Sequence, residues 1–507
     1  MDRLGPIGEA VTAALDDLRS RDAVRRMWAR DHTLWQDDPT EVADRLGWLD
    51  VAGAMATQDE RLRTFADALV SDGIEHVVVM GMGGSSLFPE VLARSFPPQA
   101  GRPGLRVLDT TDPAAVLRIT QECPPEATLF IASSKSGSTI ETLSHLAAVL
   151  EHGGDTGHVA VVTDPGSSLA ERARSERFRA LFENPADIGG RYSALSYFGL
   201  VPAAAAGLDV AALLTSADAA TAALQDPDPN ANPGLRLAAA MAGGAKVGRD
   251  KLTLVVDGEI DTIGLWLEQL LAESTGKHGT GVIPIAGERL GPPEVYGDDR
   301  LFVAIGEHHG LDPLADAGHP VVQLPSGGPD GLGELVLTWE VATALCGAAL
   351  GINPFDQPNV AQAKAATAEV LERGLGEVPV TPLDDLLGQV GPGDYVAIQA
   401  YIDPEAGEVD LLEDARTAIR DRHRVATTVG LGPRFLHSTG QLHKGGPPSG
   451  VFVQVVGDDP VDVPIPGQPF GFSTLKHAQA EGDLRTLQDQ GLRAGRVALA
   501  DLQEVAR

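Results

Sequence analysis

The chain has few cysteines, few basic residues and no long apolar run. Its 507 residues include two cysteines, Cys123 and Cys346, which are too few for a disulfide framework and lie outside any Cys-x-x-Cys motif. Lysine and arginine number 39 against 71 aspartate and glutamate residues, which gives a formal net charge of −32. That charge opposes binding to nucleic acid or to an anionic membrane. We therefore expect structural thiols and neither kind of partner.

Membrane-spanning and secretory segments are not evident either. No stretch reaches the roughly 18 unbroken apolar residues that a spanning helix needs. Residues 1–16 do not have the basic start and apolar run of a signal peptide. We expect a cytoplasmic protein, and the composition, 43% hydrophobic and 22% charged, is typical of a globular one.

What the chain does contain is a long alternation of strand-length and helix-length segments, which begins near residue 75. Such alternation predicts an α/β fold with parallel sheets covered by helices on both faces. A third stretch of this kind, from residue 395 onward, is either a separate domain or the remainder of the second sheet. The earlier parts are expected to be an N-terminal helical segment at 1–50, a first α/β domain at 51–208, a helical linker at 209–250 and a second α/β domain from 251.

The most informative segment is a hydroxyl-rich turn between a predicted strand and a predicted helix. Ser133 to Thr139 carries five Ser or Thr hydroxyls together with Lys135 and one glycine. Hydroxyls and free amides at a helix N-terminus point toward a bound anion, and the helix dipole favours its negative charge. Capping a helix needs only one or two hydroxyls. We therefore interpret the turn as a cradle for a phosphoester rather than as an ordinary helix cap.

Three further motifs carry groups suited to binding or to acid–base chemistry. The glycine turn Met80 to Ser86 follows a predicted strand and would let a ligand approach the backbone, although a plain tight turn is the alternative. Arg191 follows two glycines that could present it to a cavity, whereas a surface salt bridge is the plainer explanation. Gln269 and Glu273 lie at i and i+4 near the end of an amphipathic helix. Because a carboxylate is disfavoured at a helix C-terminus, Glu273 suggests a use beyond stability, although most such residues are solvated.

Two loop-rich segments add a lysine and two histidines. Asn353 to Lys364 ends on the lysine, and Phe435 to Gly445 contains His437 and His443 beside hydroxyl and amide side chains. A lone histidine is usually structural, so neither residue points to chemistry by itself. No histidine–carboxylate cluster has the spacing of a metal site, and we expect neither a metal nor a cofactor.

Together these motifs resemble those of the glucose-6-phosphate isomerase family, over about 81–446. They follow the family's order: Gly83-Gly-Ser85, Ser134-Lys-Ser-Gly-Ser-Thr139 with Glu141-Thr142, Gly189-Gly-Arg-Tyr-Ser193, Glu273-Ser-Thr-Gly-Lys277, and Phe355-Asp-Gln with Lys364. The resemblance implies two doubly wound sugar-isomerase domains around a phosphosugar. It also implies a reversible aldose–ketose isomerase of glycolysis and gluconeogenesis, which converts glucose 6-phosphate to fructose 6-phosphate.

The resemblance implies a role for each matching residue. Glu273 would be the base that moves a proton between C2 and C1 through a cis-enediol, and Arg191 would face the enediolate. Lys364 would help at the ring oxygen, and a histidine would open the ring. The implied substrate-binding residues are Gly84, Ser85, Ser134, Lys135, Ser136, Thr139, Gln269 and Gln357. Independently of the family, proton abstraction beside a carbonyl needs a carboxylate within hydrogen-bond reach and a fixed cation near the oxyanion.

The ring-opening histidine departs from the family's layout. The family's Thr-Asn-Gly-Gln-His segment precedes the lysine motif, whereas the match here, Ser438 to His443, follows Lys364 and has one inserted residue. The isomerase part of fused transaldolase/phosphoglucose isomerase chains is similar around 436–445. A permuted second domain would explain the order, and we expect the third α/β stretch to complete the second sheet, so that this domain spans 251–507. We assign ring opening to His443, and the alternatives are His437, His278, His308, His309 and His319.

Substrate range and assembly leave alternatives open. The hydroxyl turn is closer to that of bifunctional phosphoglucose/phosphomannose isomerases, so mannose 6-phosphate is a second possible substrate. A non-catalytic phosphosugar-binding regulator is a further alternative, but no basic helix-turn-helix segment supports it. In the family the histidine comes from the partner subunit, so the resemblance implies a homodimer, although a permuted domain could have removed that need.

Overall fold

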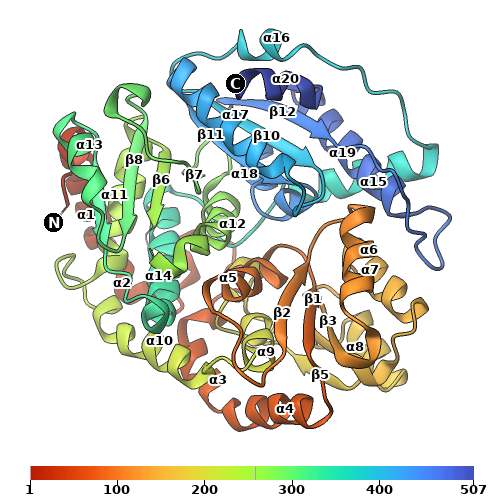
Figure 1. The fold of residues 1–507 in the computed structure, drawn as a ribbon. Helices are drawn as coiled ribbons and strands as arrows, with labels where there is room; N and C mark the ends of the chain where they lie inside the picture. The colour runs from red at the N-terminus through yellow and green to blue at the C-terminus, as the bar shows by residue number, and fades with distance from the viewer. Residues whose placement is uncertain (1, 257) are drawn as a thin grey trace.

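The computed structural model of the protein contains three parallel sheets, which have five, four and four strands. The structure describes residues 2–256 and 258–507, and only the backbone of His309, Val360, Ala361 and Ala363. Helices pack around each sheet, and the three units follow one another along the chain from red through green to blue (Figure 1). The predicted α/β class with parallel sheets is confirmed.

The first sheet brings the glycine turn and the hydroxyl turn to one place. Its strand order is β2-β1-β3-β4-β5, with all neighbours parallel, so the order reverses between β1 and β3. Ligands of doubly wound sheets bind outside the carboxyl ends of the strands at such a reversal. The glycine turn follows β1 and the hydroxyl turn follows β3, so both lie at this point. The elements of this unit are β1 (His76–Met80), α5 (Leu87–Ser95), β2 (Gly104–Leu108), α6 (Pro113–Glu122), β3 (Thr128–Ser133), α7 (Ile140–Glu151), β4 (Val159–Thr163), α8 (Ser168–Ser175), β5 (Ala180–Glu183) and α9 (Tyr197–Ala205).

The second sheet supports the helix that carries Glu273. Its order is β7-β6-β8-β9, again parallel, and α12 follows β6 and packs against β7, α14 and α5. Because the apolar side chains of α12, Trp266 and Leu270 among them, are buried between these elements, Gln269 and Glu273 are buried with them. The elements are α11 (Pro233–Lys246), β6 (Lys251–Val256), α12 (Gly264–Thr275), β7 (Ile283–Ile285), β8 (Arg300–Ile305), α13 (Asp312–Asp316), β9 (Val321–Leu324) and α14 (Leu332–Leu350).

The C-terminal strands form a third sheet of their own, so the expectation that they complete the second sheet is wrong. Their order is β11-β10-β12-β13, and β10 is hydrogen-bonded on both sides within this sheet. The second sheet ends at the short strand β7, which contains Pro284. A proline has no N–H to donate to a further strand and is confined to sheet edges. The elements are α15 (Val360–Arg373), α16 (Leu383–Leu387), β10 (Tyr395–Tyr401), α17 (Glu408–His423), β11 (Ala426–Leu431), α18 (Gly440–Gly445), β12 (Gly450–Val456), α19 (Phe472–Asp489), β13 (Arg493–Arg496) and α20 (Leu499–Val505).

The largest hydrophobic core is shared by the N-terminal helices and the first two sheets. It includes Val11 of α1, Val79 of β1, Leu254 of β6 and Val336 of α14. Since this core is continuous, it does not mark a boundary at 208 or 250, and the domain division stays a prediction. The remaining helices are α1 (Gly8–Ser20), α2 (Ala23–Trp28), α3 (Val51–Ala56), α4 (Asp59–Ser71) and α10 (Val210–Leu224).

The helical segment Pro329–Leu350, which contains α14, is the one described segment long and apolar enough to match a membrane span by length and composition. In the most apolar part of this segment 94% of the residues are buried inside the protein, where α14 packs against α10, α11 and α12. Such burial is typical of a core helix that is apolar on every side.

Candidate active site

The glycine turn after β1 packs tightly against three other segments. A Cβ atom added to Gly84 would lie 2.0 Å from the carbonyl oxygen of Gly190, and Gly83 has a positive φ of 56°. A Cβ atom on Gly83 would lie 2.5 Å from the carbonyl oxygen of His437 and 2.8 Å from Nε2 of Gln269. The glycines are therefore required for close packing of the Arg191 loop, α12 and the segment around His437. Ser85, predicted to bind substrate, is buried in this turn.

The hydroxyl turn leaves the N-terminus of α7 without a side-chain cap. Thr139 is the N-cap residue but accepts no capping hydrogen bond, and its Oγ1 lies 2.8 Å from Oγ of Ser134. The amide of Gly137 donates to that same Ser134 hydroxyl at 3.2 Å, and Oγ of Ser136 lies 3.1 Å from Oγ of Ser138. The hydroxyls thus hold the turn in shape by bonding one another. The first amides of α7 and its dipole are left facing a place suited to an anion.

Lys135 lies beside this turn with its charge already engaged. Its Nζ is ion-paired with Asp164 and is 3.2 Å from the carbonyl oxygen of Ala186. Burial raises the pKa of Asp164, which the contact with Lys135 opposes. The lysine is 27% exposed, so it remains partly accessible.

Glu273 and Arg191 form a buried ion pair at the centre of the site. Arg191 Nη1 donates to Glu273 Oε2 at 3.2 Å, and the two residues are 3% and 5% exposed. Burial raises the pKa of Glu273, and the adjacent guanidinium of Arg191 opposes that rise. A carboxylate with a raised pKa, fixed beside an immobile cation, has the properties of a general base that works near neutral pH.

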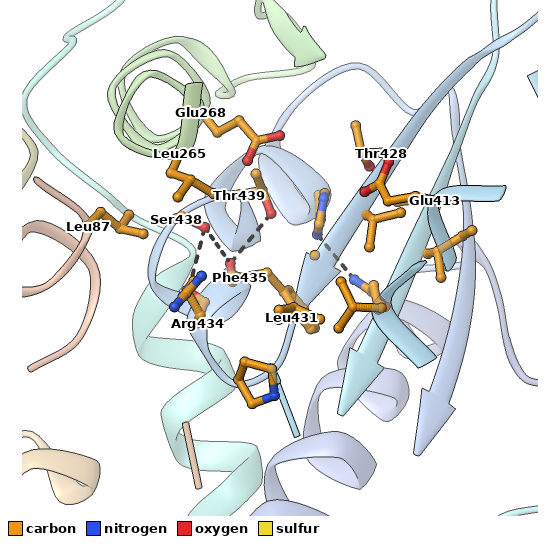
Figure 2. A pocket seen from close by; sticks show the side chains of 18 of the residues that line it. Leu87, Leu265, Glu268, Glu413, Thr428, Leu431, Arg434, Phe435, Ser438 and Thr439 are labelled. Carbon is orange, nitrogen blue, oxygen red and sulfur yellow. Dashed lines mark hydrogen bonds between the residues drawn. The ribbon is translucent and has the colours of Figure 1, made fainter. Parts of the chain in front are cut away.

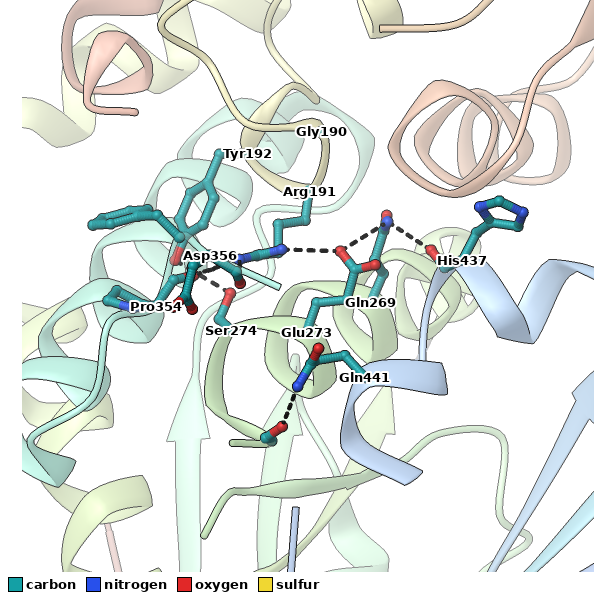
Figure 3. Close-up of polar contacts among 12 residues, drawn as sticks. Gly190, Arg191, Tyr192, Gln269, Glu273, Ser274, Pro354, Asp356, His437 and Gln441 are labelled. Atoms are coloured by element: carbon teal, nitrogen blue, oxygen red, sulfur yellow. Dashed lines mark hydrogen bonds and ion pairs between the residues drawn. The ribbon is translucent and has the colours of Figure 1, made fainter. Parts of the chain in front are cut away.

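Gln269 connects this pair to the segment around His437. Its Nε2 lies 3.3 Å from Oε2 of Glu273, one turn along α12, and donates to the carbonyl oxygen of His437 at 2.8 Å. Figure 3 shows the continuous row from Arg191 through Glu273 and Gln269 to His437. The predicted i and i+4 arrangement on α12 is therefore present, and it points into the protein.

His437 is bound by a carboxylate from a distant part of the chain. Its Nε2 lies 2.9 Å from Oε1 of Glu141, in the first turn of α7, and that oxygen also accepts from Nε2 of Gln479 on α19 at 2.7 Å. Burial by itself would raise the pKa of Glu141, but the adjacent His437 lowers it below the ordinary value of a glutamate. The histidine is 18% exposed, so it remains accessible.

A pocket of about 260 Å³ lies between the hydroxyl turn and this histidine. Its lining includes Thr139, Glu141, Lys364, His437 and Gln479. Lys364 is exposed on α15 and belongs to the lining of the pocket. The pocket therefore joins the N-terminal end of α7 to the histidine, and Gln269 leads from there to Glu273.

His443, the histidine predicted to open the ring, lies in a different pocket. That pocket, of about 210 Å³, is also lined by Glu268, Thr428 and Arg434, and Figure 2 shows these three side chains around it. The ring of His443 packs against two phenylalanines, and its Nδ1 lies 3.2 Å from Nε2 of Gln399. Burial lowers its pKa to about 3. Neither Glu273 nor Lys364, both of which the structure describes, lines this pocket.

Several predicted residues are not brought together with the others. Gln357 is exposed, and none of its described neighbours is hydrogen-bonded to its side chain. His278 is exposed, and His319 is packed against Tyr296 and Phe302. His308 lines neither of these two pockets in the described part of the chain, and the side chain of His309 lies outside the described residues.

Two residues in this arrangement were missed by sequence reasoning. Glu141 was noted as part of a motif but received no role, although an acidic residue in the first turn of a helix is a recognised local signal. Gln479 lies in the middle of α19 and has no local signal. Its place beside Glu141 depends on the packing of the third unit on the first.

Comparisons with known proteins place similar sequences along much of this chain. A family model described as phosphoglucose isomerase matches residues 41–283. The chain is 31% identical to a glucose-6-phosphate isomerase of Rubrobacter xylanophilus over 363 residues, 60% of this chain and 84% of that protein. It is also 31% identical to a glucose-6-phosphate isomerase of Thermus thermophilus, over 65% of this chain and 91% of that one.

Solved structures show a similar fold. A hypothetical protein of Thermus thermophilus has a TM-score of 0.61 at 28% identity, which covers 73% of this chain and 100% of that one. A glucose-6-phosphate isomerase of Chlamydia trachomatis has a TM-score of 0.58 at 20% identity, over 72% and 86% of the two chains. The second of these similarities concerns the fold alone.

Proposed function

This chain belongs to the glucose-6-phosphate isomerase family, and from that premise we propose that it interconverts glucose 6-phosphate and fructose 6-phosphate through a cis-enediol. The observation that carries the proposal is the buried pair of Glu273 and Arg191, which Gln269 joins to the histidine pocket. Such a pair supplies a base and an oxyanion-stabilising cation within one hydrogen bond of each other.

The phosphate would be held at the N-terminus of α7. The uncapped first turn and the hydroxyls of Ser134, Ser136 and Thr139 support this role. Lys135 would add a positive charge by moving away from Asp164 when the phosphate arrives. Anchored there, a six-carbon sugar would extend toward α12 and would bring C1 and C2 toward Glu273.

Proton transfer would be performed by Glu273. In its ionised form it would remove the C2 proton of the open-chain aldose and return it to C1. Arg191 would stabilise the negative charge that develops on the oxygens of the enediolate, where a fixed cation in a buried site acts strongly. The raised pKa of Glu273 suits both halves of this cycle, because the same carboxyl group must accept and release the proton near neutral pH.

Ring opening is assigned to His437 in place of His443. His437 lines the pocket, and Glu141 would hold its ring in place while it transfers a proton to the ring oxygen. Lys364, on the same pocket, would assist at that oxygen. His443 has no comparable access, and its low pKa keeps it neutral.

The wider setting follows from the family. We place the reaction in glycolysis and gluconeogenesis in the cytoplasm, with no cofactor, since the steps above use acid–base groups only. A homodimer remains a prediction from the resemblance. The mass of the particle in solution tests it.

The direct test is conversion of glucose 6-phosphate by the purified protein in D₂O, followed by NMR. Transfer through an enediol would place solvent deuterium at C2 of glucose 6-phosphate and at C1 of fructose 6-phosphate. Binding of either sugar without conversion would contradict the proposal and favour the phosphosugar-binding regulator. Comparable rates with mannose 6-phosphate would identify the bifunctional phosphoglucose/phosphomannose isomerase instead.

A further inference from the structure

Lys277, which follows the end of α12, is buried against a loop that has no place in the proton transfers described above. It is 0% exposed. Its Nζ donates to the carbonyl oxygen of Asn353 at 2.5 Å, to that of Asp356 at 2.6 Å and to Oδ1 of Asp356 at 2.5 Å. An ammonium group has three protons, so all of them are directed to the segment 353–356.

Arg191 binds the same loop. Its Nη2 donates to the carbonyl oxygen of Pro354 at 2.9 Å and to that of Asp356 at 2.8 Å. The carbonyl oxygen of Asp356 therefore accepts from both cations. Only Nη1 of Arg191 is directed to Glu273, as Figure 3 shows for the row from Asp356 through Arg191 to Glu273.

A purely structural anchor would not require a lysine at this position. Burying a charge costs free energy, and replacing a buried ion pair by apolar groups of similar volume is often neutral or stabilising. Here the lysine is four residues from Glu273 and shares a carbonyl with Arg191, so two like charges are held close together. Burial and the proximity of Arg191 lower the pKa of Lys277 to about 7. We therefore explain this buried lysine by the position of the loop and of Arg191 that it maintains.

We propose that Lys277 and Asp356 are positioning residues for the isomerase reaction. They fix the position of the loop 353–356, so that its carbonyl groups accept hydrogen bonds from the guanidinium of Arg191 and keep it beside Glu273. Without Lys277 the loop would lose three hydrogen bonds, and Arg191 would lose its fixed acceptors. The proposal rests on the proposed function, because it assigns Arg191 to the enediolate.

The main test replaces Lys277 by methionine and compares it with a matched control. Lys277→Met should lower kcat by about 10- to 100-fold while KM changes little, because a displacement of about 1 Å in a catalytic group can cost 10²-fold. The control is Lys251→Met. Lys251 is also a buried lysine with acidic partners, Asp250 and Asp299, but it lies at the amino end of β6. Its replacement should lower the melting temperature and leave kcat unchanged.

A second readout separates positioning from loss of stability. The charge of Lys277 lowers the pKa of Glu273, as do Arg191 and His437, which face the same carboxylate. Its removal should raise that pKa and move the acid limb of the pH profile of kcat/KM to higher pH. Lys251→Met should not move this limb.

If Lys277→Met does not fold, the variant Asp356→Asn tests the same proposal. Asparagine keeps the backbone carbonyl and the size of the side chain but leaves the lysine without its carboxylate. A reduced kcat with near-normal KM would support the proposal. Unchanged kcat in this variant or in Lys277→Met, or equal losses in both lysine variants, would overturn it. If the protein without any substitution shows no isomerase activity, the proposed function itself is contradicted. Failure of the proposed function is therefore distinguishable from failure of the positioning role.

Discussion

Two buried glutamates at opposite helix ends have opposite electrostatic properties. Glu141 lies in the first turn of α7, where His437 and Gln479 contact one of its oxygens and its pKa is lowered. Glu273 lies in the last turn of α12, where Arg191 and Gln269 contact it and its pKa is nonetheless raised. Burial acts on both groups in the same direction, so the difference comes from their surroundings.

The comparison suggests a division of work between the two carboxyl groups. A helix N-terminus favours negative charge and a C-terminus disfavours it, so α7 stabilises an ionised Glu141 and α12 opposes an ionised Glu273. A carboxylate with a lowered pKa can accept a hydrogen bond from a histidine and hold its ring in place. A carboxylate with a raised pKa can exchange a proton with a substrate. The first suits ring opening and the second suits proton transfer between C1 and C2.

The largest expected effect is on Glu273. Glu273→Gln keeps the size and the hydrogen bonds of the side chain but removes the group that exchanges a proton. Turnover of glucose 6-phosphate should fall on the order of 10²-fold or more, as measured by an assay coupled to fructose 6-phosphate formation. Deuterium uptake at C2 in D₂O should fall in parallel. Near-normal turnover would show that Glu273 is not the base, and the proposed division of work between Glu141 and Glu273 would be wrong.

A smaller, substrate-dependent effect is expected on the Glu141 side. His437→Ala should slow turnover of the ring-closed sugar by about 10²-fold at most, because ring opening also proceeds slowly in water. An open-chain analogue should react nearly normally, since it needs no ring opening. Glu141→Gln should show the same selectivity, with a loss of roughly 10-fold, the lower range for groups that orient a histidine.

The control for this prediction is His443→Ala, which changes a histidine in the other pocket. It should destabilise the protein but affect ring-closed and open-chain substrates equally. A loss confined to the ring-closed sugar in His443→Ala, together with normal kinetics in His437→Ala, would restore the assignment made from the sequence.

The smallest effect is on stability, where the two glutamates should differ in sign. The folded pKa of Glu141 is lowered, so its ionisation stabilises the fold above the unfolded pKa, and this contribution is lost as pH falls through the folded pKa. The folded pKa of Glu273 is raised, so its ionisation at pH 7 destabilises the fold. At pH 7, Glu141→Gln should lower the free energy of unfolding and Glu273→Gln should raise it, each by about 0.5 to 2 kcal/mol.

Thermal or denaturant unfolding at pH 7 and near pH 4 measures this difference. The stabilising effect of Glu273→Gln should vanish at the lower pH, because the carboxyl group is then protonated in both states. Changes of the same sign in the two variants at pH 7 would show that hydrogen bonding, rather than charge, dominates both sites.

Much of the site could be predicted from short segments of sequence. The hydroxyl turn, the glycine turn and the pair at Gln269 and Glu273 each lie within a few residues, and their patterns follow from helix ends and helical spacing. The α/β class follows from the alternation of strands and helices. The strand order that brings the first two motifs together is typical of doubly wound sheets, so their proximity was within reach.

The rest depended on contacts between distant segments. The bond between His437 and Glu141 joins residues 296 positions apart, and no local pattern distinguishes His437 from His443. The separate third sheet depends on where the second sheet ends, at a short edge strand that contains Pro284. The shared loop of Lys277 and Arg191 is likewise visible only in three dimensions.

By itself the sequence determined which chemical groups the protein has and on which helix ends and turns they lie. This was enough for an anion site, a candidate base and a family. The tertiary structure alone decided which histidine meets the pocket, which loop fixes Arg191 and in which direction each buried carboxyl group shifts its pKa. The physical reason is that a pKa and a catalytic contact depend on burial and on neighbours a few ångströms away in space, whereas local sequence patterns reflect the backbone conformation of adjacent residues.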